Sequence, residues 1–178
     1  MPITAEAATQ AVRAAVAAAA GVAATAVRVG NADPVRGSSA YYVVTTITDQ
    51  ATGYPTSTGG IGATALTLRQ TREASLQILG VGQGTQAKLQ ALVAHLLSPR
   101  SSIAIALRSA GCSVIRFVGP RDMSAFYQTG TEPRFTLDIT IQYVLEVTAN
   151  AALGDVDAIE VDLYTADGIE VEPAVVVP

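Results

Sequence analysis

Residues Gly80 to Gly84, with the sequence GVGQG, form the one segment that has the composition of a phosphate-binding loop. The dinucleotide fingerprint needs the spacing G-x-G-x-x-G and an acidic residue about 20 positions later. Here the third glycine comes one residue early, no acidic residue occurs between Glu73 and Asp122, and no Gly-Lys-Ser/Thr follows. We therefore interpret this segment as a strand-to-helix turn and expect no nucleotide or other cofactor.

His95 and Cys112 are the single histidine and the single cysteine of the 178-residue chain. The usual zinc sites need four cysteine or histidine ligands, or three and a water, which one residue of each type does not supply. A catalytic triad needs a nucleophile and an acid beside the histidine, and nothing near His95 in the sequence suggests either. Cys112 has no flanking basic residue that would lower the pKa of its thiol. We expect a partly buried structural histidine, a small core cysteine and no internal disulfide.

Seven carboxylates lie between Asp155 and Glu172 without an intervening base, and they are the remaining candidates for metal binding. They alternate with apolar residues, whereas a calcium loop has closely spaced oxygen ligands. We expect strands that face solvent or a subunit, and no metal site. The ten arginines and one lysine are scattered and not interleaved with aromatic residues, which disfavours sequence-specific nucleic-acid binding. The chain shows no catalytic constellation, so we expect no enzyme; a small hydrolase is the last-ranked alternative.

The element that dominates the pattern is Arg134 to Val147, where every odd position is apolar and all but one even position is polar. Strict alternation is the period of a β-strand with one face on a core. Fourteen residues at about 3.3 Å each give roughly 46 Å, far longer than an ordinary strand of about 5–6 residues. Such a strand needs equally long neighbours or must reach beyond its own domain.

Other segments predict the remaining elements of an N-terminal body. Helices are expected at Thr4–Ala20, with weak one-sided packing through Val12 and Val16, and at Thr85–Leu97, followed by a helix capped by Ser98. Strands are expected at Tyr41–Thr48, at Thr64–Leu79 and at Cys112–Val118, before a turn at Gly119-Pro120. Gln70 and Arg72 interrupt the apolar face of the second strand, where we expect a bulge or a bend away from the core. Asn31–Ala40 has turn composition. Asp49–Gly62 is a polar, glycine-rich loop, either functional or a flexible tip, and we expect it to order on assembly.

Strands and helices do not alternate regularly, which indicates an α+β fold: a mostly antiparallel sheet with long strands and helices packed on one face. Ala158–Thr165 and Ile169–Val177 flank Asp167-Gly168 and predict a C-terminal β-hairpin. We therefore expect a body at residues 1–150 and an acidic hairpin extension at 151–178. No secretion signal or membrane-spanning segment is expected, because the Ala-rich start is short and carries Glu6 and Arg13.

The charge is divided unequally along the chain. Residues 1–120 hold nine basic and four acidic side chains, a net charge of +5, and residues 121–178 hold two basic and eleven acidic ones, a net charge of −9. Opposite charges favour head-to-tail contact between copies, although both portions can also fold into one mixed surface. Arg69 and Arg72 can face DNA or an acidic neighbour. The expected interface residues are Arg69, Arg72, Arg121, Arg134, Asp155, Asp157, Glu160, Asp162, Glu170 and Glu172.

Two regions of the sequence resemble a known family. The first is REASLQILG at residues 72–80, followed by the leucine-rich helix. The second comprises AGCSVIRFV at 110–118, PRDMS at 120–124 and EPRFTLDI at 132–139. The segment at 36–48 fits loosely as well. In this order, over residues 30–148, they resemble the tail or neck terminator proteins of long-tailed bacteriophages.

This resemblance implies a virion protein of the tail-neck region, assembled in the host cytoplasm. It implies a ring, commonly a hexamer, that ends the tail tube and joins the tail to the head-neck connector. The implied partners are other copies of the chain, the tube protein, the head-completion or connector protein and, in a contractile tail, the sheath protein. DNA passes through the hole without sequence-specific binding. The alternative is another virion ring or adaptor, such as a head-completion or baseplate component.

Overall fold

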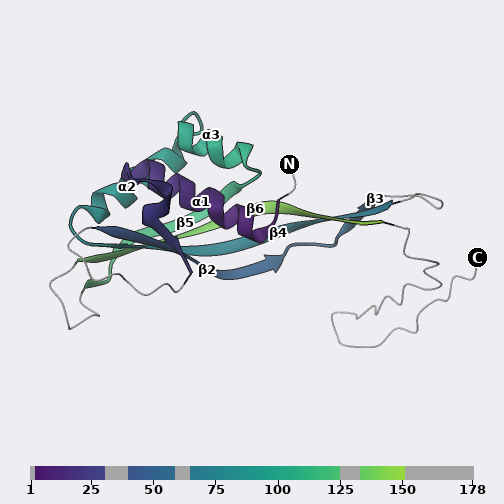
Figure 1. Cartoon of the computed structure of the whole chain (residues 1–178), viewed down its shortest axis with the longest axis horizontal. Helices are drawn as coiled ribbons and strands as arrows, with labels where there is room; N and C mark the ends of the chain where they lie inside the picture. Colours follow the sequence, from purple (N-terminus) through teal and green to yellow (C-terminus); the bar gives the residue numbers. More distant parts are fainter. Residues whose placement is uncertain (1–2, 31–39, 59–64, 125–132, 151–178) are drawn as a thin grey trace, which may run out of the picture.

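The computed structural model describes residues 3–30, 40–58, 65–124 and 133–150, which form one open sheet with a layer of helices on one face (Figure 1). The described residues that lie between helices and strands form short connections. The elements in chain order are α1 (Ala5–Ala20), η1 (Ala24–Ala26), β1 (Val27–Val29), β2 (Tyr41–Ala51), β3 (Thr56–Thr58), β4 (Ala65–Val81), α2 (Thr85–Leu97), α3 (Ser102–Ser109), β5 (Ser113–Asp122) and β6 (Arg134–Asn150).

The sheet has the strand order β1-β2-β4-β6-β5, and β3 adds to β4. Every pairing is antiparallel except the short parallel pairing of β1 with β2. The long strands β4 and β6 pair without a register shift from Ala65–Asn150 at one end to Val81–Arg134 at the other. This arrangement confirms the expected α+β class, including the mostly antiparallel sheet and the one-sided helical layer.

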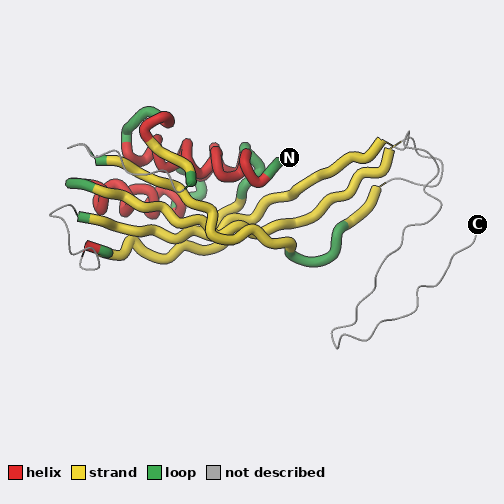
Figure 2. Tube along the Cα trace, turned by 60° about the horizontal axis from the view of Figure 1, so that its bottom comes forward, coloured by secondary structure: helices red, strands yellow, loops and turns green. Residues whose placement is uncertain are grey.

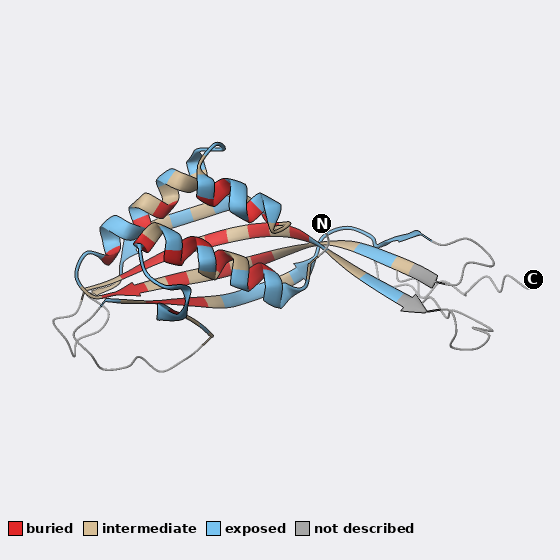
Figure 3. Cartoon of the chain, turned by 45° about the horizontal axis from the view of Figure 1, so that its top comes forward, coloured by how far each residue is buried: buried red, intermediate tan, exposed pale blue. Residues whose placement is uncertain are grey.

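The core lies between the helices and one face of the sheet (Figure 3). On β4 the even positions from Ala74 to Ile78 are buried, and on β6 the odd positions from Phe135 to Tyr143 are buried, as the period-2 pattern predicts. The helices cover these positions with the buried side chains Val12, Val16, Leu89, Leu92, Ile103 and Leu107. Burying these apolar side chains is the main force that holds the layer on the sheet.

Helix α1 begins and ends where its sequence predicts. The Thr4 hydroxyl accepts a hydrogen bond from the Ala7 N–H at 3.1 Å, and Gly21 ends the helix in the left-handed region at φ 70°. The expected weak packing is wrong, because seven α1 residues are buried, and four of them are alanines. Small side chains let this helix lie close to the sheet and to both other helices.

The cap of α3 differs from its prediction. Ser98 ends α2 and Ser101 begins α3: the Ser101 hydroxyl accepts from the Ala104 N–H at 3.0 Å and donates to the His95 carbonyl at 2.7 Å. Pro99 therefore lies in the connection and not in the first turn of the helix. The helical spacing of the leucines also predicts that Leu97 lies on the apolar face of α2, but this residue is 65% exposed.

Three strand predictions also need correction. Strand β2 runs on to Ala51, and Thr56–Thr58 forms β3, so that much of the predicted loop at 49–62 is strand. The bulge lies in β2, between Thr46 and Thr48. Strand β4 pairs through Gln70 and Arg72 without a register shift, so of the two alternatives there, a bulge or a bend, the bulge is wrong. Strand β5 does not turn at Gly119-Pro120 but continues to Asp122 across a register shift. The predicted turn at 31–39, the loop residues 59–62 and the hairpin at 151–178 lie outside the described residues.

Candidate assembly surfaces

The most distinctive surface is an arm of the sheet that projects past the helices. We define the arm as residues 52–58, residues 65–72 of β4 and residues 143–150 of β6. Figure 1 and Figure 2 show these strands continuing well beyond the end of the helical layer. Residues 65–72 alone span about 26 Å at 3.3 Å per residue. The N-terminus of α1 marks the start of the arm, since the Ile3 N–H donates to the Val144 carbonyl at 2.8 Å.

The face of the sheet that forms the core elsewhere is uncovered on the arm. Leu68 and Val147 are register partners on this face, and they are 41% and 53% exposed. Leu76 and Ile141, on the same face of the same strands, are 1% and 0% exposed. The arm holds four of the eleven large exposed apolar residues among the described ones: Tyr54, Leu68, Val147 and, on the opposite face, Val144. Ile47, at the β2 bulge beside the arm, is a fifth. Exposed apolar side chains gathered in this way mark a contact surface.

A polar cluster fixes the base of the arm. The Arg72 Nε donates to Asp49 Oδ1 at 3.0 Å, and the Tyr143 hydroxyl donates to Asp49 Oδ2 at 2.8 Å. The Arg72 side chain also donates to the Asp49 carbonyl at 3.1 Å. Burial, and then the hydrogen bond to Asp49, raise the pKa of Tyr143 to about 12, and the same carboxylate raises the pKa of Arg72. The cluster joins β2, β4 and β6 where the apolar core ends.

The opposite face of the sheet is mainly polar, and none of the described helices covers it (Figure 3). Its apolar side chains are Val43, Leu79 and Val81 near one end, together with the exposed Val118 and Val144. Its charged side chains pair across strands: Arg69 with Glu146, and Arg121 with Asp138, which also accepts from Gln77 at 3.1 Å. On the arm, the Thr67 and Thr148 hydroxyls lie 3.3 Å apart. This face therefore presents neutral polar groups and charges that are largely balanced within the chain.

The predicted interface residues fall into two groups. Arg69, Arg72, Arg121 and Arg134 all lie on the sheet, and the first three pair with carboxylates of their own chain: Glu146, Asp49 and Asp138. The six predicted acidic residues, Asp155, Asp157, Glu160, Asp162, Glu170 and Glu172, lie outside the described residues. Sequence reasoning missed Asp49 and Tyr143. The signal that could have found them is Arg72, a charged side chain on an apolar strand face, which needs a partner there.

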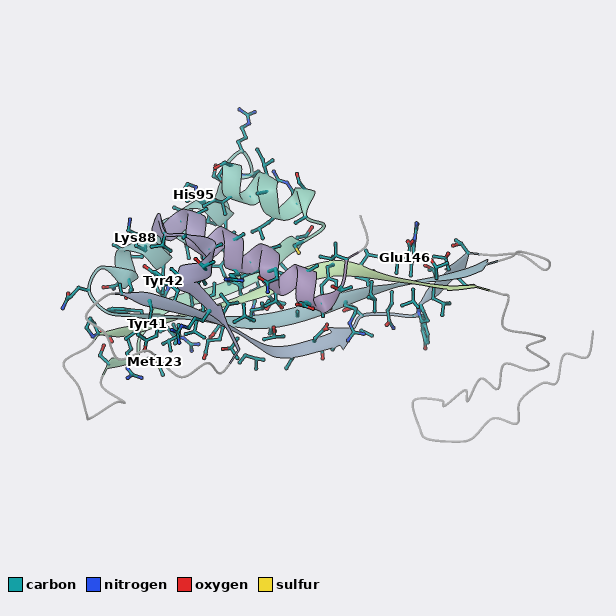
Figure 4. All side chains as sticks on the ribbon, in the orientation of Figure 1. Tyr41, Tyr42, Lys88, His95, Met123 and Glu146 are labelled. Carbon is teal, nitrogen blue, oxygen red and sulfur yellow. The ribbon has the colours of Figure 1, made fainter. Side chains whose placement is uncertain are left out.

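The other residues singled out for chemistry have structural positions. Gly80 and Val81 end β4, and Gly82 to Gly84 connect it to α2, with Gly82 and Gly84 at positive φ. The Gly82 N–H donates to the Pro133 carbonyl at 2.9 Å. A side chain at Gly80 would meet Thr85 at 3.0 Å, so this glycine permits the close approach of helix to strand. His95 is half-buried near the end of α2, on the helical layer with Lys88, whereas Glu146 lies on the arm (Figure 4).

Cys112 is fully buried beneath α2 and α3, as expected for a core cysteine. Burial raises the pKa of its thiol to about 11. At pH 8 only about one thiol in a thousand is then ionised, compared with about a quarter for an unperturbed thiol.

We predict that maleimide labelling of Cys112 at pH 8 is at least about a hundredfold slower in the native protein than in denaturant, because both access and ionisation oppose it. Mass spectrometry over a time course measures both rates. Equal rates in the two states would contradict the buried position.

One family comparison decides the class of protein. A protein-family model described as phage neck terminator protein matches residues 6–169. The chain belongs to this family. No curated protein matches it. The neck terminator family match includes α1 and all the strands, and it extends past the described residues into the acidic segment.

Membership in the neck terminator family makes the chain a structural protein of the phage tail-neck region that interacts with other head or tail proteins. The suspected terminator resemblance is thus confirmed. Among the described residues, no helix is long and apolar enough to cross a membrane. The same part of the chain holds no group of three or more His, Cys, Asp or Glu side chains arranged to bind a metal ion.

Proposed function

We propose that this neck terminator forms a homo-oligomeric ring, with six copies, that ends the tail tube and joins the tail to the head-neck connector. The observation that carries this proposal is the arm, whose apolar face has no cover among the described residues of its own chain. Apolar side chains such as Leu68 and Val147 gain about 1.5–3 kcal/mol each when fully buried. By analogy with the family, a neighbouring copy or a tube subunit would cover the apolar face of the arm.

The partners follow from a position at the end of the tube: the tube protein on one side, the head-completion or connector protein on the other, and the sheath protein in a contractile tail. Assembly takes place in the host cytoplasm before the parts join in the virion. We also propose that residues 1–150 form the body and that residues 151–178 form an acidic hairpin extension. Its carboxylates, from Asp155 to Glu172, would meet basic side chains of a neighbour.

The polar sheet face supports passage of DNA through the ring. Protein–DNA affinity depends mainly on cations that contact phosphates. On this face Arg69 and Arg121 already pair with Glu146 and Asp138, so their charge is offset within the chain. A surface of hydroxyls, amides and balanced charges lets DNA slide without tight binding. We therefore propose that this face lines the hole.

Mass photometry and negative-stain imaging of the full chain, alone and with tube protein, test the ring. We expect closed rings, alone or capping the head-proximal end of the tube. A monomer at every salt concentration, with and without tube protein, would overturn the proposal. Rings bound only at the distal end would instead favour a baseplate component.

A further inference from the structure

We propose that the arm of one copy lies in a groove between α1 and α3 of the next copy. This inference deepens the proposed ring, on which it rests, by naming the two surfaces that meet. The groove has a volume of about 390 Å³ and is lined almost entirely by apolar side chains. Ala15, Ile103 and Leu107 are its buried residues, and Ala14, Ala18 and Ala106 are among its exposed ones.

The apolar surfaces match in chemistry. Leu68 and Val147 are neighbours on the paired strands β4 and β6, with Cβ atoms about 5 Å apart in such register pairs, so they form one continuous apolar patch. The alanines that line the groove leave space for this patch and allow a close approach of the neighbour's strands. Tyr54, a residue of the arm that is 95% exposed, is the type of side chain that anchors interfaces.

The charges also match. Residues 5–20 and 85–110 hold four basic side chains, Arg13, Lys88, Arg100 and Arg108, and one carboxylate, Glu6, a net charge of +3. Residues 151–178, which follow directly on the end of the arm, hold seven carboxylates and no base, a net charge of −7. An arm placed on the neighbour's helices brings the negative segment to a positive surface.

The geometry makes this contact intermolecular. The arm extends away from the helical layer of its own chain (Figure 1, Figure 2), and β4 and β6 pair along it without a bulge that could turn it back. Because the arm and the groove are different surfaces, the contact is head-to-tail and builds a ring when its rotation closes.

Cysteine cross-linking tests the contact. Val147→Cys and Ala106→Cys are prepared separately in a Cys112→Ala background, mixed with tube protein present, and treated with a short bismaleimide. We expect a product of twice the chain mass. Two matched controls each change one thiol of the test pair. Thr148→Cys with Ala106→Cys moves the arm thiol to the other face of the arm. Val147→Cys with Ala87→Cys moves the groove thiol to an exposed position on α2. Both controls should give at least tenfold less product.

The outcomes separate this contact from the ring itself. Rings in the images without preferential cross-linking of the test pair would overturn the arm-and-groove contact and leave the ring standing. Preferential cross-linking with images of dimers or open chains would support the contact and overturn the ring. A monomer that gives no cross-link would overturn both.

Discussion

Replacing Asp49 with alanine is expected to lower the free energy of unfolding by about 2–3 kcal/mol, because it leaves two partly buried polar partners unsatisfied. Arg72 would keep its positive charge at the sheet face without the carboxylate at 3.0 Å, and the Tyr143 hydroxyl would lose its acceptor at 2.8 Å. The Asp49 and Arg72 side chains are only 21% and 23% exposed, so water replaces these contacts incompletely.

Urea unfolding at a protein concentration where the chain is monomeric measures this effect. The matched control is Glu146→Ala, which also removes a carboxylate from an arginine of β4, but at a pair whose Arg69 side chain is 55% exposed. Exposed pairs contribute about 0–1 kcal/mol, so the control should change stability little. Equal losses of stability in the two variants would show that the Asp49–Arg72 pair contributes no more to stability than the more exposed Arg69–Glu146 pair.

Most of the sheet could be predicted from the sequence, because strand β6 alternates over its whole length. The odd positions from Phe135 to Tyr143 are buried as the period predicts, and the pattern of β4 matches them across the register. The helices were also predicted, since Thr4 caps α1 and leucines of α2 recur at helical spacing. Local patterns of this kind depend on neighbours in sequence and need no knowledge of the fold.

The features that could not be predicted depend on contacts between distant residues. Gln70 and Arg72 interrupt an apolar face, and a local interpretation predicts a bulge or a bend there. In the structure Arg72 stays in register and pairs with Asp49, 23 residues away, and the bulge lies in β2. Ser98 and Ser101 both suit a helix cap, and local sequence does not separate them; in the structure the Ser101 hydroxyl accepts from the Ala104 N–H and also donates to the His95 carbonyl of α2.

The extent of the helical layer is the most important of these unpredicted features. Periodicity shows which face of a strand is apolar, but it does not show where the helices that cover that face end. This face of β4 keeps its register with β6 from Ile78 to Leu68 and is interrupted only by Gln70 and Arg72. Along it the exposed fraction rises from 0% at Ile78 to 41% at Leu68. The same alternation therefore specifies a core at one end and an open apolar surface at the other.

Alanine substitutions at the two ends of that face are expected to affect different properties: the one at the buried end stability, and the one at the exposed end assembly. Leu76→Ala should lower the free energy of unfolding of the monomer by about 2–5 kcal/mol, because it opens a cavity at a side chain that is 1% exposed. Leu68→Ala, on the same face of the same strand, should change it by no more than about 0.5 kcal/mol. Urea unfolding below the assembly concentration compares the two.

Assembly should respond in the reverse sense to these two variants. Burying a leucine at an interface contributes about 1.5–3 kcal/mol, so Leu68→Ala should raise the concentration needed for half-assembly at least about tenfold. Mass photometry across a dilution series measures this, with Thr67→Ala on the opposite face as control. A Leu68→Ala monomer as destabilised as Leu76→Ala would mean that the arm is covered within its own chain, and the apolar face would then be part of the core and not a contact between copies.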